Sequence, residues 1–159
     1  MRAHQHAAGA PGGQENQAIG RTAGGLTSKL HMCMGAAGNP VHFILSQGQE
    51  HDVTKAEEIS GHLAGGSTLL ADKGYDSSDF RIALLVKNIN PQIPSRKNRI
   101  YKPPYDQDKY RNRSRIERFF AKLKQYRGFA TRYDKLAHSF LSQVALACAI
   151  ISISTALNF

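Results

Sequence analysis

The chain has 159 residues, with 21 Lys plus Arg against 12 Asp plus Glu and a formal net charge of +9. This length allows one domain of ordinary size and excludes a large multidomain enzyme. Hydrophobic residues make up 41% of the chain and charged residues 21%, a composition that excludes wholesale disorder and fibrous architectures.

The first 25 residues are rich in Gly, Ala and Gln and show neither helical nor alternating periodicity. They predict a flexible arm that adds nothing to the core, followed by one domain over residues 26–159. Alternating residues over 26–34 predict a strand, GAAGNP supplies turn residues, and VHFILSQG from Val41 predicts a second strand. Together these segments indicate a β-hairpin.

The middle of the chain predicts a helix, a strand, a second helix and a second strand. Thr54 and Glu57 stand at the spacing of a capping box, so the first helix should begin between Asp52 and Thr54 and end near His62. The apolar run 67–71 should form a short strand that ends at Asp72. Two further elements and a loop follow: a helix capped by Asp76-Ser77-Ser78 to about Lys87, a strand over 89–93, and a basic, proline-broken loop SRKNRIYKPPYDQ.

Positive charge is concentrated in one third of the chain. Residues 81–135 contain sixteen Lys or Arg and four Asp or Glu, whereas the rest holds five basic and eight acidic residues. A region of this kind favours a polyanion such as nucleic acid as its partner. The alternative is a solvated basic surface that keeps the protein soluble.

An amphipathic helix is predicted from Gln107 to about Tyr126, where Gly and Pro are absent. Its apolar face contains Ile116, Phe119, Phe120 and Leu123. At ~100° per residue, a second stripe beside that face contains Tyr110, Arg113, Glu117 and Lys124. Arg113 and Glu117 at i, i+4 form a surface ion pair in the simplest interpretation. The other interpretation is that a single acid in a basic field holds a cation.

The last segment, Ser139 to Phe159, carries no charge and is close in length to a membrane span. Seven of its residues are polar, which favours a buried core helix over a membrane helix. Cys33 and Cys148 lie far apart in sequence, without ligand spacing or a disulfide pattern. These features favour a cytoplasmic protein that does not enter the membrane.

The helix stripe carries a family resemblance. Tyr, two residues, Arg, three residues, Glu, six residues, Lys is the signature of the DDE transposases of bacterial insertion sequences, and Tyr110, Arg113, Glu117 and Lys124 match all four positions. LLADKGYD, residues 69–76, resembles the second acidic motif of that family, with Asp72 at the catalytic Asp. GRTAGGLTSKLH, GNP, GQEHD and ATRYDKLA also resemble family segments, so the similarity covers nearly the whole chain.

The resemblance implies an α/β fold of the ribonuclease-H-like type, a mixed sheet flanked by helices, here with a truncated N-terminal strand. It implies cleavage and transfer of DNA strands at element ends, with Mg²⁺ or Mn²⁺ as cofactor. Asp72 and Glu117 would be the catalytic metal ligands. The DNA-binding residues would be Tyr110, Arg113 and Lys124, together with Lys73 and Arg115 beside the two motifs.

One position departs from the family pattern. The first catalytic Asp lies just before a segment similar to RAHQHAAGA, and here Met1 stands immediately before Arg2. We therefore expect the downstream half of a split reading frame, inactive or impaired alone, which pairs with an upstream fragment or forms a homodimer. Asp52 could lie near the carboxylate cluster or cap a helix, and the cap is favoured. Two alternative functions are a catalytically inactive DNA-binding regulator of the intact transposase and a poorly folding remnant of a decayed element.

Overall fold

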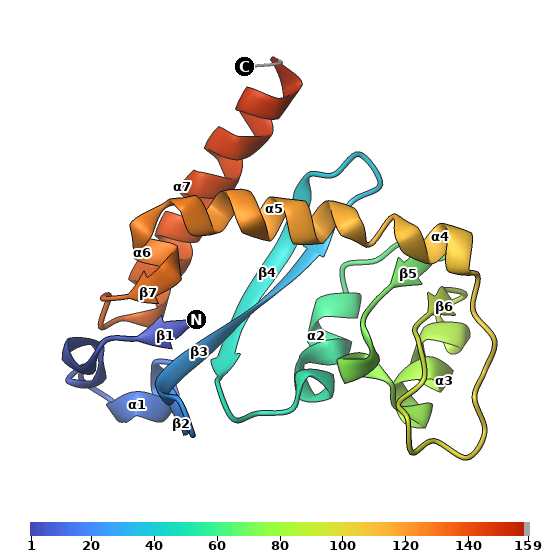
Figure 1. The fold of residues 1–159 in the computed structure, drawn as a ribbon, viewed down its shortest axis with the longest axis horizontal. Helices are drawn as coiled ribbons and strands as arrows, with labels where there is room; N and C mark the ends of the chain where they lie inside the picture. Colours follow the sequence, from blue (N-terminus) through green and yellow to red (C-terminus); the bar gives the residue numbers. More distant parts are fainter. Residues whose placement is uncertain (158–159) are drawn as a thin grey trace. The chain divides into compact units, whose positions relative to one another are not determined.

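The computed structural model describes residues 1–157 and divides the chain into two compact units. The first unit comprises residues 1–50 and 118 onward, and the second comprises residues 51–117 (Figure 1). The boundary at 117 lies within helix α5, Ser114–Gln125. The α/β class is confirmed, whereas one catalytic domain over residues 26–159 stays a prediction.

The first unit contains a mixed five-stranded sheet. Its strands are β1 (Arg2–Ala3), β2 (Gly20–Thr22), β3 (Gly25–Met34), β4 (Pro40–Gln47) and β7 (Thr131–Arg132). The order is β2-β3-β1-β7, with β4 also paired to β3, and β1 runs parallel to β7. The predicted hairpin is confirmed, because β3 and β4 pair antiparallel from Ser28 opposite Gln47 to Cys33 opposite His42.

The first unit also contains short helices and one long helix, besides the part of α5 from Arg118 onward. They are η1 (Gln5–Ala8), α1 (Gly13–Asn16), α6 (Arg127–Ala130) and α7 (Ala137–Ala156). The prediction that residues 1–25 add nothing to the core is wrong, because Ala3, Ala7 and Ile19 form a buried cluster with Leu26 packed against it. Small side chains and one β-branched residue suffice to fill this space, although they show no periodicity in the sequence.

Helix α7 buries one face and exposes the other. Phe140, Val144, Ala147, Cys148 and Ile151 are buried, as expected of a core helix. The opposite face leaves Leu146, Ile150, Ile153 and Leu157 exposed. Within the described residues, α7 is the helix that is long and apolar enough to span a membrane, a criterion that core helices of soluble proteins also meet. Residues 158–159 of the predicted terminal helix lie outside the described part of the chain.

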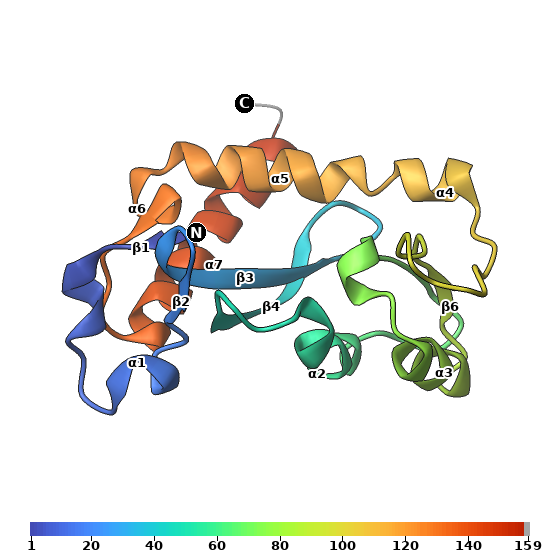
Figure 2. The same ribbon diagram turned by 60° about the horizontal axis from the view of Figure 1, so that its bottom comes forward.

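The second unit is built around a parallel β-α-β motif. Its helices and turns are η2 (Asp52–Lys55), α2 (Ala56–Ser60), η3 (Lys73–Tyr75), α3 (Ser78–Val86) and α4 (Gln107–Arg111). Strands β5 (Thr68–Leu70) and β6 (Asn90–Gln92) pair in parallel and form a sheet of their own. Figure 2 shows α2 and α3 next to each other, and the core here consists of Ala56, Phe80, Leu84, Ile89 and Ile93.

A buried arginine joins four segments of the first unit. Arg132 on β7 has no exposed surface, and it donates from Nη1 to the carbonyl oxygen of Gln17 at 2.8 Å and to Oγ of Ser28 at 3.0 Å. Its Nε donates to the carbonyl oxygen of Asp134 at 3.0 Å, and its guanidinium lies 5.3 Å from the centre of the Phe140 ring. Burial lowers the pKa of Arg132, and the negative charge of Asp134 acts in the opposite direction by raising it.

We predict that Arg132→Met lowers the free energy of unfolding by about 2 kcal/mol, because the buried hydroxyl of Ser28 and the half-buried carbonyl oxygen of Gln17 lose their donor. Arg118→Met is the matched control, since Arg118 is exposed on α5 and should change stability by less than about 0.5 kcal/mol. Urea unfolding followed by circular dichroism measures both variants. Equal stabilities for the two variants would show that Arg132 does not hold this unit together.

Candidate functional site

Asp72 lies where strand β5 leads into a tight turn of the second unit. It occupies the N-cap position of η3, and its Oδ1 accepts a hydrogen bond from the backbone N–H of Gly74 at 2.8 Å. An Asp at an N-cap satisfies a backbone donor that the helical turn leaves free. The predicted order of strand, carboxylate, turn and helix is confirmed, and this bond fixes the orientation of the carboxylate.

Asp52 approaches the same turn from η2. A Cβ atom added to Gly74 would lie 2.7 Å from Oδ2 of Asp52 and 2.8 Å from Oδ1 of Asp72, so the glycine leaves the space between these two carboxylates open. The negative charges of both residues also act on Tyr75, whose pKa is raised first by burial and then by Asp52 and Asp72.

The prediction that Asp52 caps a helix is wrong. His51 occupies the N-cap position of η2, and Asp52 is the first residue of that turn. The capping box is also absent, since the hydroxyl of Thr54 donates backwards to the carbonyl oxygen of His51 at 2.7 Å. A Thr hydroxyl can either cap a helix or bind a backbone carbonyl oxygen of its own turn, and the sequence spacing does not show which of the two occurs.

The predicted helix from Gln107 to Tyr126 is interrupted. Helix α4 ends at Arg111 and α5 begins at Ser114, with bonds from Asn112 N–H to Lys109 O and from Arg113 N–H to Tyr110 O in the turn between them. These bonds span three residues rather than four, so the chain tightens at this point. The apolar face of the second part is as predicted, with Phe119 and Leu123 buried.

Because of the interruption, Tyr110 lies in α4, Arg113 in the turn that follows, and Glu117 in α5. Arg113 Nη2 pairs with Oε1 of Glu117, and the Arg113 guanidinium lies 5.6 Å from the centre of the Tyr110 ring. The Tyr110 ring also meets that of Tyr105 edge-on at 5.3 Å. Arg113 therefore bridges the tyrosine and the glutamate of the predicted stripe.

Tyr110 connects this stripe electrostatically to Asp72. Burial is the main cause that raises the pKa of the Tyr110 phenol, and the charge of Arg113 opposes it. The charges of Asp72 and Glu117 both raise that pKa further. Both carboxylates therefore oppose ionisation of the Tyr110 phenol.

The remaining predicted DNA-binding residues are basic and exposed. Lys73 belongs to η3, directly after Asp72, and Arg115 belongs to the first turn of α5 in the same unit. Lys124 lies near the end of α5, in the first unit. All three residues are exposed to solvent.

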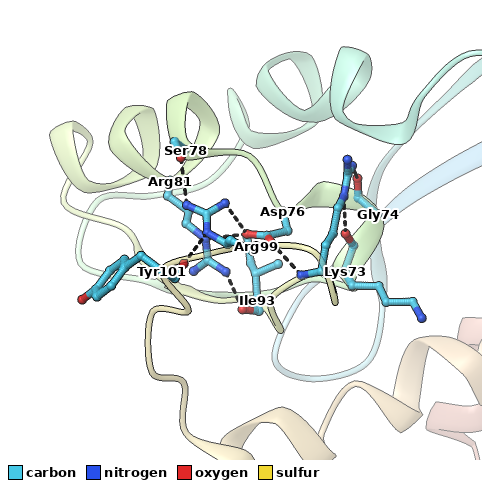
Figure 3. A network of polar contacts seen from close by, with 9 residues as sticks. Lys73, Gly74, Asp76, Ser78, Arg81, Ile93, Arg99 and Tyr101 are labelled. Carbon is cyan, nitrogen blue, oxygen red and sulfur yellow. Dashed lines mark hydrogen bonds and ion pairs between the residues drawn. The ribbon is translucent and has the colours of Figure 1, made fainter.

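The sequence interpretation missed the most connected carboxylate of the second unit. Asp76-Ser77-Ser78 was expected to cap α3, and Ser77 does occupy the N-cap position, although its side chain makes no capping hydrogen bond. The Asp76 side chain is instead only 1% exposed. Its Oδ1 accepts from Nε of Arg81 at 2.9 Å and from Nη1 of Arg99 at 3.0 Å (Figure 3). Its Oδ2 accepts from the backbone N–H of Arg96 at 2.9 Å. Only the fold unites these partners, so no local sequence signal reveals them.

Arg96 extends this network to the turn after Asp72. Its Nε donates to the carbonyl oxygen of Lys73 at 3.2 Å, and its Nη2 donates to that of Gly74 at 2.8 Å. Arg81 in turn donates to the carbonyl oxygen of Ile93 at 2.6 Å, where β6 ends. Asp76 and its arginines therefore tie the Asp72 turn, α3 and the basic loop together.

Comparison with known proteins bears on the family of the chain. The family model described as "Transposase DDE domain" matches residues 1–152. The chain belongs to the DDE transposase family. A relative from Brucella ovis, a putative transposase for insertion sequence element IS6501, is 35% identical over 128 residues, which cover 79% of this chain and 98% of that protein. No solved structure matches the chain.

DDE transposases use divalent metal ions, and the carboxylate side chains of this DDE domain are of the type that binds such ions. Carboxylate oxygens are the ligands that Mg²⁺ and Mn²⁺ prefer, and Gly74 keeps the space beside Asp72 free of a side chain. Within residues 1–157, no three His, Cys, Asp or Glu side chains converge closely enough to hold a metal ion. The Glu117 carboxylate is instead paired with Arg113.

We predict that Asp76→Asn lowers the free energy of unfolding of this DDE domain by about 3 kcal/mol at neutral pH, because Arg81 then stays buried without an opposite charge. Asp79→Asn, at an exposed position of α3, is the control and should have little effect.

Asp76→Asn should also change how the free energy of unfolding depends on pH in the acid range. Burial opposes ionisation of Asp76, but hydrogen bonds from Arg96 and Arg81 and the charges of Arg81 and Arg99 outweigh it, so the pKa lies below its ordinary value. Ionised Asp76 therefore stabilises the fold above about pH 4 and loses this effect as the pH falls through the lower, folded pKa. Chemical unfolding at several pH values should show a flatter acid limb in Asp76→Asn; identical limbs would contradict the assignment.

Proposed function

We propose that this chain is the catalytic part of an insertion-sequence transposase that cleaves and transfers DNA strands at element ends. The observation that carries the proposal is the geometry of two carboxylates within one compact unit: Asp72 is held at the N-cap of η3 beside the open space at Gly74, and Glu117 is paired with Arg113. The ribonuclease-H-like type is the fold we propose for the complete catalytic arrangement. The relative's printed name, a putative transposase for an insertion sequence element, supports the same reaction class.

Asp72 and Glu117 are the residues that would hold Mg²⁺ or Mn²⁺. When bound, such ions supply activation of a water or a 3′ hydroxyl and stabilisation of the departing oxygen. The chain contributes orientation: the Gly74 N–H holds one oxygen of Asp72, and Arg113 holds one oxygen of Glu117. Release of Arg113 towards a DNA phosphate would free the Glu117 carboxylate to bind the ion.

DNA is the proposed partner of the basic surface. Tyr110 would support the DNA end, and Arg113 and Lys124 would contact phosphate or terminal bases, while Lys73 and Arg115 add charge near the two carboxylates. The exposed cations of α5 alone comprise Arg115, Arg118, Lys122 and Lys124. We further propose a cytoplasmic location and pairing with a second transposase chain.

A second candidate function is DNA binding without cleavage, as in a regulator of the intact transposase. It is favoured by the lack of a three-residue metal-ligand group within residues 1–157. This candidate shares the basic surface with the first but assigns no chemistry to Asp72 and Glu117.

We predict that the protein nicks supercoiled DNA carrying the element ends only when Mg²⁺ or Mn²⁺ is present. Glu117→Gln should abolish nicking, because the amide is a poor ligand for a hard cation, and should leave DNA binding intact. Glu58→Gln, an exposed position of the same unit, is the control. Metal-independent binding without nicking under any condition would contradict cleavage and support the second candidate.

We predict that Arg113→Ala weakens binding to an element end more than binding to random duplex. Arg113 sits between Tyr110 and Glu117, whereas Arg111, paired with Asp108 and 80% exposed, is a generic phosphate contact and serves as the control. Fluorescence anisotropy over a range of salt concentrations measures both effects. Affinity for both DNAs should fall steeply with salt; equal losses on the two DNAs would make Arg113 a generic contact as well.

A further inference from the structure

The loop between β6 and α4 exposes two adjacent hydrophobic residues. Ile100 is fully exposed, with a relative exposure of 103%, and the adjacent Tyr101 is 73% exposed. Single exposed apolar residues are common, but two large neighbours at the tip of one loop are a compact apolar surface. We call Ile100 and Tyr101 the loop tip.

The backbone around the loop tip is firmly anchored. Arg99 donates from Nη1 to Asp76, from Nη2 to Oγ of Ser78 at 2.8 Å, and from Nε to the carbonyl oxygen of Tyr101 at 2.8 Å. In Figure 3 the Tyr101 ring points away from this network. A side chain presented by a rigid support loses little conformational entropy on binding, so the loop tip is preorganised for a ligand.

The charge around the loop tip identifies the class of ligand. Residues 94–102 contain four basic residues and no acidic one. Arg96 and Arg99 form the anchor, while Lys97 and Lys102 are exposed on either side of the tip. Unpaired DNA has exposed base faces that stack on apolar and aromatic side chains, and its phosphates bind cations. A loop tip with a cation on each side is therefore complementary to unpaired DNA.

The anchor also ties the loop to the proposed cleavage residue. Arg96 is bonded to the carbonyl oxygens of Lys73 and Gly74, the two residues that follow Asp72. A strand held by the loop tip would therefore lie near the carboxylate to which we assign catalysis.

We propose that Ile100 and Tyr101 stack on bases that are unpaired next to the cleavage position, while Lys97 and Lys102 contact the flanking phosphates. This inference rests on the proposed function, because it takes DNA as the substrate. It adds a specificity to that function: the protein should prefer a frayed DNA end to an intact duplex.

The test compares two probes of the same sequence, a blunt duplex and a duplex with a short unpaired fork that carries 2-aminopurine. Binding is measured by anisotropy in EDTA, so that cleavage does not contribute. The full chain should bind the fork more tightly and quench 2-aminopurine fluorescence through stacking. The double variant Ile100→Ser/Tyr101→Ser should lose roughly tenfold in affinity for the fork, lose the quenching, and bind the blunt duplex as before.

Two controls separate stacking from other effects. Val86→Ser removes a hydrophobic residue that is 81% exposed on α3 of the same unit, and it should keep both the fork preference and the quenching. Lys97→Ala/Lys102→Ala should weaken binding to both probes by a similar factor while retaining the quenching.

Several results would overturn the inference: equal losses of the tip variant on both probes, an unchanged fork affinity, or tip-dependent binding to anionic vesicles in place of DNA. Failure of the proposed function is a separate result. A chain that never nicks DNA yet loses its fork preference in the tip variant would contradict cleavage and support the loop tip. A chain that nicks DNA but has no tip-dependent fork preference would contradict the loop tip alone.

Discussion

The second unit depends on one buried carboxylate, that of Asp76. It neutralises Arg81 in the interior and Arg99 in the basic loop, and it orders the backbone of Arg96. A buried carboxylate with two guanidinium partners and a backbone donor is stable only when all partners are present. The strand end at Ile93, the start of α3 and the basic loop therefore share one electrostatic centre.

This centre determines how Asp72 is presented. Arg96 binds the carbonyl oxygens of the turn from outside, while the Gly74 N–H binds the Asp72 carboxylate from within. The turn is thus held on both sides. Glu117 is held differently, by a single ion pair to Arg113, which a phosphate could displace. A rigid aspartate and a releasable glutamate suit a site that assembles when DNA binds.

The sequence predicted those features that depend on local spacing. The hairpin, the strand that leads to Asp72 and the apolar face of α5 follow from periodicity and turn residues. The break before Ser114 and the role of Asp76 could not be predicted, because they depend on three-residue turns and on partners up to 23 residues away. Asp52 was misassigned for a related reason: its neighbour in space is Gly74, which sequence spacing does not identify.

The central claim is that Asp72 and Glu117 share one divalent cation. Titration of Mn²⁺ into the ¹⁵N-labelled protein tests it directly, because the paramagnetic ion broadens the amide resonances nearest to it. The account predicts that the resonances of Gly74 and Glu117 broaden together at the same low Mn²⁺ concentration, and that Asp72→Asn removes the broadening at both. Broadening at one of them alone, or broadening that survives in Asp72→Asn, would contradict a shared site.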